Sequence, residues 1–363
     1  MMPRAAWRHV DWPDRMSFET RSSSSRRPII LWLLSVAALV FAMVLLGGYT
    51  RLTESGLSMV NWHPLSGLLP PLDTAAWQRE FAAYQAYPEF QKLNSWMGLK
   101  DFKAIYYVEY AHRMLGRLIG LVFLLPFLWF LAGKWIDRQL GLRLAGLFLL
   151  GAAQGGLGWF MVKSGLIDRP DVSHYRLTAH LGLAVAIYGA IIWVALGETG
   201  LGRPGGQGTR RLSRHLGLVV GLIYLQILLG GLVAGLDAGH AYNSWPLMAG
   251  RWLPAGLFDL SPWAINFFDN PLTVQFNHRL VAYGIVAVIG ALLWRARDIG
   301  WKSPRGRGLL VLGGAVGLQV GLGIATLLAV VPVSLGVAHQ AGALVAFTAA
   351  LVSCYLFGHN RAV

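Results

Sequence analysis

Eight apolar stretches, each close to the length that crosses a membrane, constrain this chain more than any other feature. They lie at about 29–49, 105–131, 144–163, 177–197, 215–236, 273–294, 308–330 and 336–357. A helix of about 20 apolar residues spans the hydrocarbon layer of a bilayer. With 55% hydrophobic and 13% charged residues and a mean hydropathy of +0.50, the chain carries more apolar surface than a soluble core would bury. We therefore predict an all-α membrane protein with eight transmembrane helices.

The basic residues predict how these helices are oriented. Lys and Arg gather in the segment 1–28, in the loops 133–143, 198–214 and 295–307, and at the C-terminus, so that 19 lie on one side of the membrane and nine on the other. Because cytoplasmic loops are enriched in Lys and Arg, both termini are predicted to be cytoplasmic. This topology accounts for the excess of 31 basic over 17 acidic residues, and no nucleic-acid partner is expected.

Composition divides the chain into five parts. Residues 1–28 form a cytoplasmic tail rich in Arg and Ser, 29–197 and 215–357 form two four-helix halves, 198–214 is a basic cytoplasmic linker, and 358–363 is a C-terminal tail. The first apolar run is too long for a signal-peptide core, so we predict a retained helix. A bacterial inner membrane is the expected location. The mitochondrial inner membrane is the alternative, although acidic residues interrupt the basic tail.

The two halves repeat one another. At one offset of 183, Gly47, Gly48, Gly56, Trp62, Gly67 and Pro71 match Gly230, Gly231, Gly239, Trp245, Gly250 and Pro254. Farther along, His112-Arg113, Gln154-x-Gly156-Leu157-Gly158 and Ala179-His180 match His278-Arg279, Gln319-x-Gly321-Leu322-Gly323 and Ala338-His339. Each half has an even number of helices, so the repeats are predicted to enter the membrane in the same orientation, as parallel repeats. Equivalent residues should then lie at equivalent depth.

Four of the matched residues are histidines near the outer ends of the even-numbered helices: His112, His180, His278 and His339. Ionisable residues inside membrane helices usually mark a functional site, although a lone histidine is equally well explained by a hydrogen bond between helices. Imidazole is a common axial ligand of haem iron, and a pair fills both axial positions. One bis-histidine haem site per half is therefore favoured. A tetrahedral metal site would need further ligands, which no matched Cys or Asp supplies.

The halves differ three residues before the first histidine of each pair, where the first half has Glu109 and the second has Gln275. A spacing of three places Glu109 on the same helix face as His112, within reach of a bound porphyrin. An ion pair from Glu109 to Arg113 would explain the acid without catalysis. The second half keeps Arg279 beside a neutral glutamine, so this arginine does not require a carboxylate. A catalytic first half is therefore the sharper hypothesis.

The remaining polar residues of interest leave several interpretations open. Haem propionates are candidate partners of Arg113 and Arg279, because guanidinium binds carboxylate through two parallel hydrogen bonds. Lipid headgroups and backbone carbonyls are equally compatible partners. Six histidines are not assigned to iron: His63, His174 and His240 in outer loops, and His9, His215 and His359 on the inner side.

Five motifs along the chain are specific in combination. They are Gly47-Gly-Tyr-Thr-Arg-Leu-Thr-Glu-Ser-Gly-Leu-Ser-Met59, Glu109-Tyr-Ala-His112-Arg113, His174-Tyr-Arg-Leu-Thr-Ala-His180, Asn277-His278-Arg279 and His339-Gln340. Together they resemble the haem A synthase family over about residues 29–357. Some members of that family carry a cysteine pair in the first outer loop. This chain has only Cys354, so it resembles the subgroup without the pair.

The resemblance implies an oxidoreductase that converts the C8 methyl group of haem O to the formyl group of haem A. The conversion proceeds by successive hydroxylations, with water as the implied oxygen source, and supplies haem A to terminal cytochrome oxidase. By the same resemblance, His112 and His180 are the iron ligands of the substrate haem O in the N-terminal half. Glu109 is the catalytic carboxylate, and His278 and His339 hold a haem b cofactor near the periplasmic side.

The expected partners are haem O and membrane lipid. A haem O synthase that delivers the substrate, an electron acceptor such as a quinone, and a homo-oligomer all stay open. Two other functions are also weighed. A dihaem b-type electron-transfer protein would have chemically equivalent halves, which the difference between Glu109 and Gln275 disfavours. A transporter built from parallel repeats would use the histidines in a proton path and would bind no haem.

Overall fold

The computed structural model describes residues 23–61, 68–167, 170–201 and 207–358. Eight helices in these ranges are long and apolar enough to cross a membrane. They are α1 (Ser23–Leu52), α3 (Leu99–Ala132), α4 (Arg138–Gly165), α5 (His174–Glu198), α6 (Gln207–Gly235), α8 (Pro271–Arg295), α9 (Pro304–Leu328) and α10 (Val333–Gly358). Each predicted apolar stretch corresponds to one of these helices, so the predicted all-α membrane class is confirmed.

Each of these helices begins before its predicted apolar stretch, whereas α9 ends at Leu328, two residues before the predicted end. The α1 helix begins at Ser23, inside the predicted tail, and α6 begins at Gln207, inside the predicted linker. At the start of α4, the Asp137 carboxylate accepts a hydrogen bond from the Leu140 N–H at 2.8 Å and so caps the helix in the polar loop. An apolar stretch marks only the part of a helix inside the hydrocarbon, which explains the earlier starts. Residues 1–22, 202–206 and 359–363 of the predicted tails and linker lie outside the described ranges.

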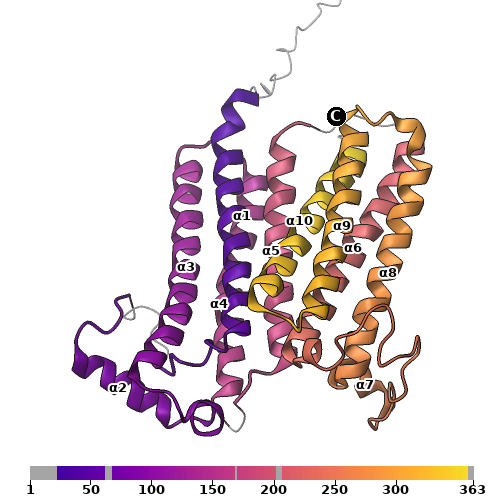
Figure 1. Ribbon diagram of the computed structural model, residues 1–363. Coiled ribbons are helices and arrows are strands. Elements are labelled where there is room, and N and C mark those ends of the chain that lie inside the picture. Colours follow the sequence, from indigo (N-terminus) through magenta and orange to yellow (C-terminus); the bar gives the residue numbers. More distant parts are fainter. Residues whose placement is uncertain (1–22, 62–67, 168–169, 202–206, 359–363) are drawn as a thin grey trace, which may run out of the picture.

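Four helices form the centre of the bundle, namely α1, α5, α6 and α10, and the other four flank them (Figure 1). The α10 helix contacts α1, α5, α6 and α9, while α5 contacts α1, α4, α6 and α10. The α3 and α4 helices lie at the side of the first half, and α8 and α9 lie at the side of the second. Fully buried side chains such as Leu33, Leu144, Leu216 and Leu344 join both halves in one apolar core. The halves therefore share a continuous interior.

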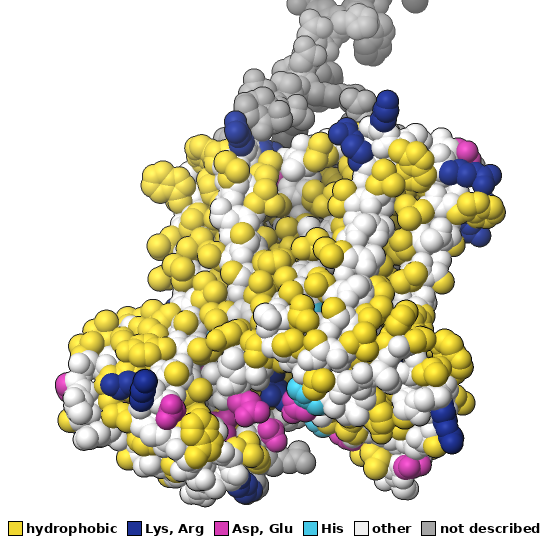
Figure 2. Space-filling model, in the orientation of Figure 1, with side chains coloured by type: hydrophobic (Ala, Val, Ile, Leu, Met, Phe, Trp, Pro, Cys, Tyr) yellow, Lys and Arg dark blue, Asp and Glu magenta, His cyan; other side chains and the backbone are white. Residues whose placement is uncertain are grey.

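The two ends of the bundle differ in structure and in charge. Both ends of the described chain lie at one end, and the short helices α2 (Thr74–Gln85) and α7 (Asn266–Asp269) lie at the other, which we name the α2 end (Figure 1). On the visible face, Lys and Arg side chains occur at both ends, whereas most Asp and Glu side chains gather at the α2 end (Figure 2). An ion pair joins the two halves at the α2 end, and another joins α1 to α5 within the first half at the opposite end. Arg51 Nη2 lies 2.7 Å from Asp237 Oδ2 at the α2 end, and Arg26 pairs with Glu198 at the other.

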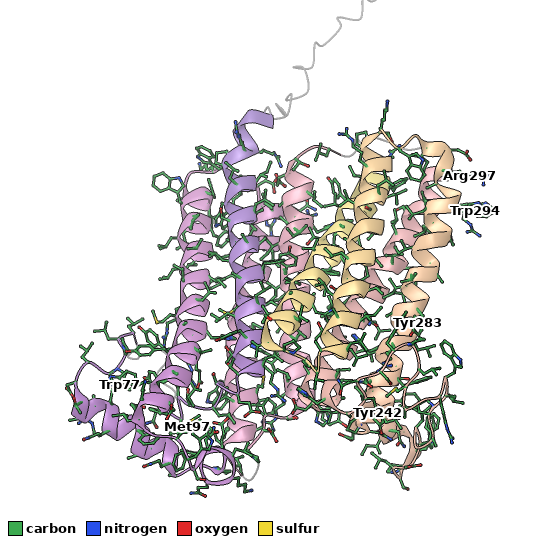
Figure 3. The ribbon with its side chains drawn as sticks, in the orientation of Figure 1. Trp77, Met97, Tyr242, Tyr283, Trp294 and Arg297 are labelled. Atoms are coloured by element: carbon green, nitrogen blue, oxygen red, sulfur yellow. The ribbon has the colours of Figure 1, made fainter. Side chains whose placement is uncertain are left out.

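A compact lobe covers the α2 end of the first half. It is built from α2, the short helix η1 (Phe90–Asn94) and the first turns of α3, which pack around a second apolar cluster. Trp77 of α2 belongs to this cluster, and Met97 packs against it (Figure 3). Inside the lobe, the Tyr84 hydroxyl donates to Glu89 Oε2 at 2.9 Å and accepts from Asn94 Nδ2 at 2.9 Å. Burial raises the pKa of Glu89 to about 8 and also raises the pKa of Tyr84.

The buried Glu89 predicts that the stability of the lobe depends on pH. The folded chain keeps the Glu89 proton up to a pKa of about 8, whereas the ordinary pKa of 4.5 applies when the lobe unfolds. The contribution to stability is therefore fully present below about pH 4.5 and is lost as pH rises to about 8. Glu89→Gln should remove this pH-dependent loss of stability. Thermal unfolding, followed by tryptophan fluorescence at about pH 5 and about pH 8, would measure the difference.

The matched control for this prediction is Glu80→Gln, which changes a partly exposed carboxylate on α2. This control should keep the wild-type loss of stability between the two pH values. An equal loss in Glu89→Gln and in the wild type would show that Glu89 does not cause it.

Candidate functional site

Four membrane-spanning helices carry the four histidines near the α2 end. His180, His278 and His339 lie six or seven residues after the starts of α5, α8 and α10, as the matched sequence positions predict. His112 lies deeper in its helix, thirteen residues after the start of α3. The difference arises because α3 continues into the lobe, where Phe102 packs against α2 residues. Helix position alone would therefore misjudge how deep His112 lies.

The rings of His278 and His339 lie across from each other in the second half. Their centroids are 6.4 Å apart, and the ring planes are inclined by 71°. A transition metal bound to imidazole lies about 2 Å from the nitrogen, and the ring centre lies about 1 Å farther, so two rings on opposite sides of one metal would have centroids ~6 Å apart. The spacing of this pair therefore fits axial ligation of a haem iron.

Buried polar atoms without partners lie beside these histidines. Among the described residues, Gln154 Oε1, Gln226 Oε1, Gln319 Oε1 and His278 Nδ1 are buried and make no hydrogen bond. Most buried polar atoms in native structures have a hydrogen-bond partner, so unpartnered atoms grouped at the histidines are consistent with a bound ligand at this place. No group of three or more His, Cys, Asp or Glu in the described ranges could hold a metal ion, so the chain offers ligand pairs. This donor set fits haem and does not fit a tetrahedral metal site.

Each histidine of a pair packs against a glycine of the neighbouring helix, and the contacts are the same in both halves. A Cβ atom on Gly47 or Gly230 would lie 3.1 or 3.3 Å from Cε1 of His112 or His278. A Cβ atom on Gly158 or Gly323 would lie 2.9 or 2.8 Å from Cε1 of His180 or His339. The space beside Gly158 and Gly323 therefore has no room for a side chain. The glycines in the matched sequence motifs let the imidazoles approach the helix backbones closely.

A matched glutamine holds the second histidine of each pair. Gln154 Nε2 lies 3.1 Å from His180 Nδ1, and Gln319 Nε2 lies 3.1 Å from His339 Nδ1. The same amide nitrogens lie 3.5 Å and 3.4 Å from the Nε2 atoms of these rings, so each amide contacts both ring nitrogens and limits rotation of the ring. The two glutamines thus orient the rings of His180 and His339.

The second glycine of each pair joins the two halves. Gly48, next to Gly47, lies directly against the Gln340 side chain of α10, which follows His339. Gly231, next to Gly230, lies against Thr178 and Leu181 of α5, which flank His180. Each Gly-Gly pair therefore contacts a histidine of its own half and the chain beside a histidine of the other half. The two Gly-Gly pairs therefore lie where the two halves meet, next to the histidine-bearing helices of both halves.

Glu109 is buried at the α2 end of the first half, with 3% of its surface exposed. Its Oε1 lies 2.6 Å from Arg113 Nη2, and its Oε2 accepts hydrogen bonds from Ser58 Oγ at 2.7 Å and from the Met59 N–H at 2.8 Å. The ion pair that the sequence offered as an alternative is therefore present. It occupies one carboxylate oxygen, while the loop after α1 holds the other.

Gln275 occupies the matched position in the second half and is equally buried, with 3% exposed. Its Oε1 accepts from Arg279 Nη2 at 3.3 Å, and its Nε2 donates to the carbonyls of Ala238 at 2.9 Å and Tyr242 at 3.3 Å. The arginine thus has a partner in both halves. The difference between the halves is that the loop donates to the carboxylate of Glu109 but accepts from the amide of Gln275.

The two arginines bind backbone carbonyls of the loops. Arg113 Nη2 donates to Met59 O at 2.7 Å, and Arg279 Nη2 donates to Tyr242 O at 2.8 Å, where the two acceptors are 183 residues apart. Tyr242 lies in the loops at the α2 end of the second half (Figure 3). The sequence left three kinds of partner open for these two arginines, and among the described residues both arginines bind backbone carbonyls.

The loops themselves also correspond between the halves. Glu54 and Asp237, 183 residues apart, both adopt the left-handed backbone conformation, with φ of 50° and 49°. This conformation is uncommon for residues other than glycine, so its occurrence at both matched positions indicates the same turn after α1 and after α6. The turn directs each loop back toward the arginine that binds it.

One histidine assigned to a loop has a different environment from the one predicted. His174 begins α5, its side chain is only 12% exposed, and its Nε2 lies 2.7 Å from Asp269 Oδ1. The hydroxyl of the next residue, Tyr175, donates to Asp269 Oδ2 at 2.7 Å. The assignment of His174 to a loop is therefore wrong, because this residue begins α5 at the place where α5 meets α7 of the other half. His240 is exposed, His215 lies within α6, and His9, His63 and His359, like Trp62 and Gly67, lie outside the described residues.

Fold and site together define a polytopic all-α membrane protein with two histidine pairs inside the bundle. The family model of the cytochrome oxidase assembly proteins, COX15-CtaA, matches residues 30–351. The chain therefore belongs to the COX15-CtaA family, and the predicted family is confirmed.

Three curated relatives, each named heme A synthase, illustrate this membership. The Nitrosospira multiformis protein is 51% identical over 328 residues, covering 90% of this chain and 92% of its own length. The Nitrosomonas eutropha protein is 48% identical over 340 residues, with coverage of 92% and 94%. The Parvibaculum lavamentivorans protein is 47% identical over 340 residues, with coverage of 93% and 96%. The similarity thus spans nearly the full length of all three.

Sequence reasoning missed the residues that hold the site residues in place. Gln154 and Gln319 were matched between the halves, and their repetition beside the glycines was a signal for a role at the histidines. Ser58 lies in a matched segment, but the second half has Ala241 there, so the comparison of halves did not mark it. The buried Glu89 had no counterpart to indicate it.

Proposed function

We propose that this protein is a haem A synthase that oxidises the C8 methyl group of haem O to a formyl group, for supply to terminal cytochrome oxidase. Membership of the COX15-CtaA family and the shared name of the relatives support this activity. The observation that carries the proposal is the asymmetry of two otherwise matching halves. Glu109 stands one helical turn before His112, whereas Gln275 stands before His278.

In this proposal the first half binds the substrate and the second half binds the cofactor. His112 and His180 flank the haem O site, with Gly47 and Gly158 giving the rings room and Gln154 orienting His180. His278 and His339 would hold haem b as axial ligands. The matching contacts in the two halves support an origin in parallel repeats. Haem b held by His278 and His339 would supply one-electron redox chemistry beside the substrate half.

The chemistry assigned to the chain is the management of charge and protons at the methyl group. Each hydroxylation adds the oxygen of one water molecule and releases two electrons and two protons, and loss of water from the doubly hydroxylated carbon leaves the formyl group. The Glu109 carboxylate would stabilise positive charge that develops at the methyl carbon or take up a proton from it. Arg113 fixes this carboxylate from one side. The released electrons require an acceptor, for which a membrane quinone has suitable chemistry.

The proposed location is the bacterial inner membrane, with both termini in the cytoplasm. The basic loops support this orientation by the positive-inside rule, and they lie at the end opposite α2. The histidine pairs near the α2 end would then lie toward the periplasm. Delivery of haem O by a haem O synthase and assembly into a homo-oligomer are compatible with this arrangement.

The test is to extract and chromatograph the haems of protein purified from cells that also make haem O. We expect haem b together with haem O, a hydroxylated intermediate or haem A. Haem b alone would favour a dihaem electron-transfer protein, in which each half binds a haem that carries electrons. Absence of any haem would overturn both functions and favour a transporter with histidines in a proton path.

A further inference from the structure

Ser58 is completely buried in the loop that follows α1, beside the carboxylate of Glu109. Its hydroxyl oxygen lies 2.7 Å from Glu109 Oε2 and 3.3 Å from the carbonyl oxygen of Ser55. A hydroxyl has one proton to donate, and the shorter contact to a charged acceptor is the stronger hydrogen bond. The Met59 N–H donates to the same carboxylate oxygen at 2.8 Å. Two adjacent residues of one loop therefore hold one oxygen of Glu109.

The matched loop of the second half lacks this hydroxyl. Ala241 stands 183 residues after Ser58, where the offset places its equivalent. Gln275 needs no donor from the loop, because its own Nε2 donates to the Ala238 and Tyr242 carbonyls. An ionised carboxylate can only accept hydrogen bonds, whereas an amide also donates. Glutamate thus occurs with serine in one half, and glutamine occurs with alanine in the other.

We propose that Ser58 is a positioning residue for the reaction, which holds the Glu109 carboxylate in a fixed orientation one helical turn from His112. The inference rests on the proposed function, in which Glu109 acts on the substrate. With Arg113 on Oε1, and Ser58 and Met59 on Oε2, both carboxylate oxygens are held and the side chain cannot rotate freely. Hydrogen bonds to charged groups are stronger than those between neutral groups, so the loss of Ser58 should release Oε2 in part.

The primary test is Ser58→Ala in the full-length protein, with haem O turnover measured at several substrate concentrations. We expect kcat to fall about tenfold to a hundredfold while KM changes little, because the hydrogen bond acts on the carboxylate and not on substrate affinity. Haem b content should equal that of the wild type. Ser58→Cys, which fills the same space with a weak donor, should show a comparable loss of kcat and so exclude an effect of the cavity.

Two further variants separate this inference from the proposed function. Ala241→Ser introduces the hydroxyl into the matched loop of the second half and should leave kcat unchanged. Ser58→Ala combined with Glu109→Gln should be no slower than Glu109→Gln alone, because Ser58 acts through the carboxylate. Full activity of Glu109→Gln would overturn the catalytic role of Glu109 itself. An inactive Glu109→Gln with a fully active Ser58→Ala would overturn only the role of Ser58, and so would a further loss in the double variant.

Discussion

Glu109→Gln is expected to bind haem normally and to form haem A at least about 100-fold more slowly than the wild type. The substitution keeps the size of the side chain but removes the negative charge next to the haem O site. Electrostatic stabilisation and proton transfer by a positioned carboxylate each contribute about 100-fold or more, so a loss of at least that size is expected. Chromatography of extracted haems should show haem O accumulating together with haem b.

The second half shows why this variant should fold. Gln275 occupies the matched position, is equally buried and still accepts a hydrogen bond from Arg279. The helix and the loop therefore tolerate an amide at this place. Glu80→Gln on α2 controls for the loss of one acidic residue at this end of the protein and should remain active. Wild-type haem A formation by Glu109→Gln would restrict Glu109 to holding the loop after α1 against α3 through Ser58 and Met59.

The fold could be predicted from the sequence because the bilayer limits the choice of structure. Backbone polar groups in hydrocarbon must be satisfied internally, so an apolar stretch of the right length indicates a helix. The same reasoning could not find α2, which is short and of mixed polarity. Its burial depends on contacts of Trp77 and Tyr84 with Phe102 of a different helix, and such contacts follow only from the tertiary structure.

The repeat explains why the histidines and Glu109 could be selected from the sequence. Comparison of the halves marks residues that match, such as His112 and His278, and residues that differ at a matched place, such as Glu109 and Gln275. It does not show which loop atom meets a side chain. The hydrogen bond from Ser58 to Glu109 joins residues 51 positions apart, and no sequence periodicity links a loop to a helix in this way.

The contact of each Gly-Gly pair with both halves could be found only from the structure. The sequence shows that Gly47-Gly48 matches Gly230-Gly231, but helix packing shows that each pair serves both halves. Gly48 contacts Gln340, and Gly231 contacts Leu181 at the matched place. A change at either Gly-Gly pair would disturb both sites at once. The effects of single histidine variants should therefore be interpreted for each half by direct measurement of its haem.

His278→Ala is expected to abolish binding of haem b, with a loss of at least about tenfold in the haem b content of purified protein. The variant removes one of two ring ligands whose centroids lie 6.4 Å apart, and it leaves a buried cavity beside Gly230. A metal site that loses a protein ligand loses affinity steeply, and the remaining His339 fills only one axial position. Reduced-minus-oxidised absorption spectra and extracted haem would measure the effect.

Two matched variants make the result on His278 specific. His112→Ala, at the equivalent place of the first half, should keep haem b and lose bound haem O. His215→Ala, on α6, changes a histidine whose Nδ1 contacts the Arg211 carbonyl at 2.7 Å and should keep both haems. If His278→Ala kept haem b while His112→Ala lost it, the resident cofactor would belong to the first half. Glu109 would then stand beside the cofactor and not beside the substrate, so this comparison tests the assignment of the two halves directly.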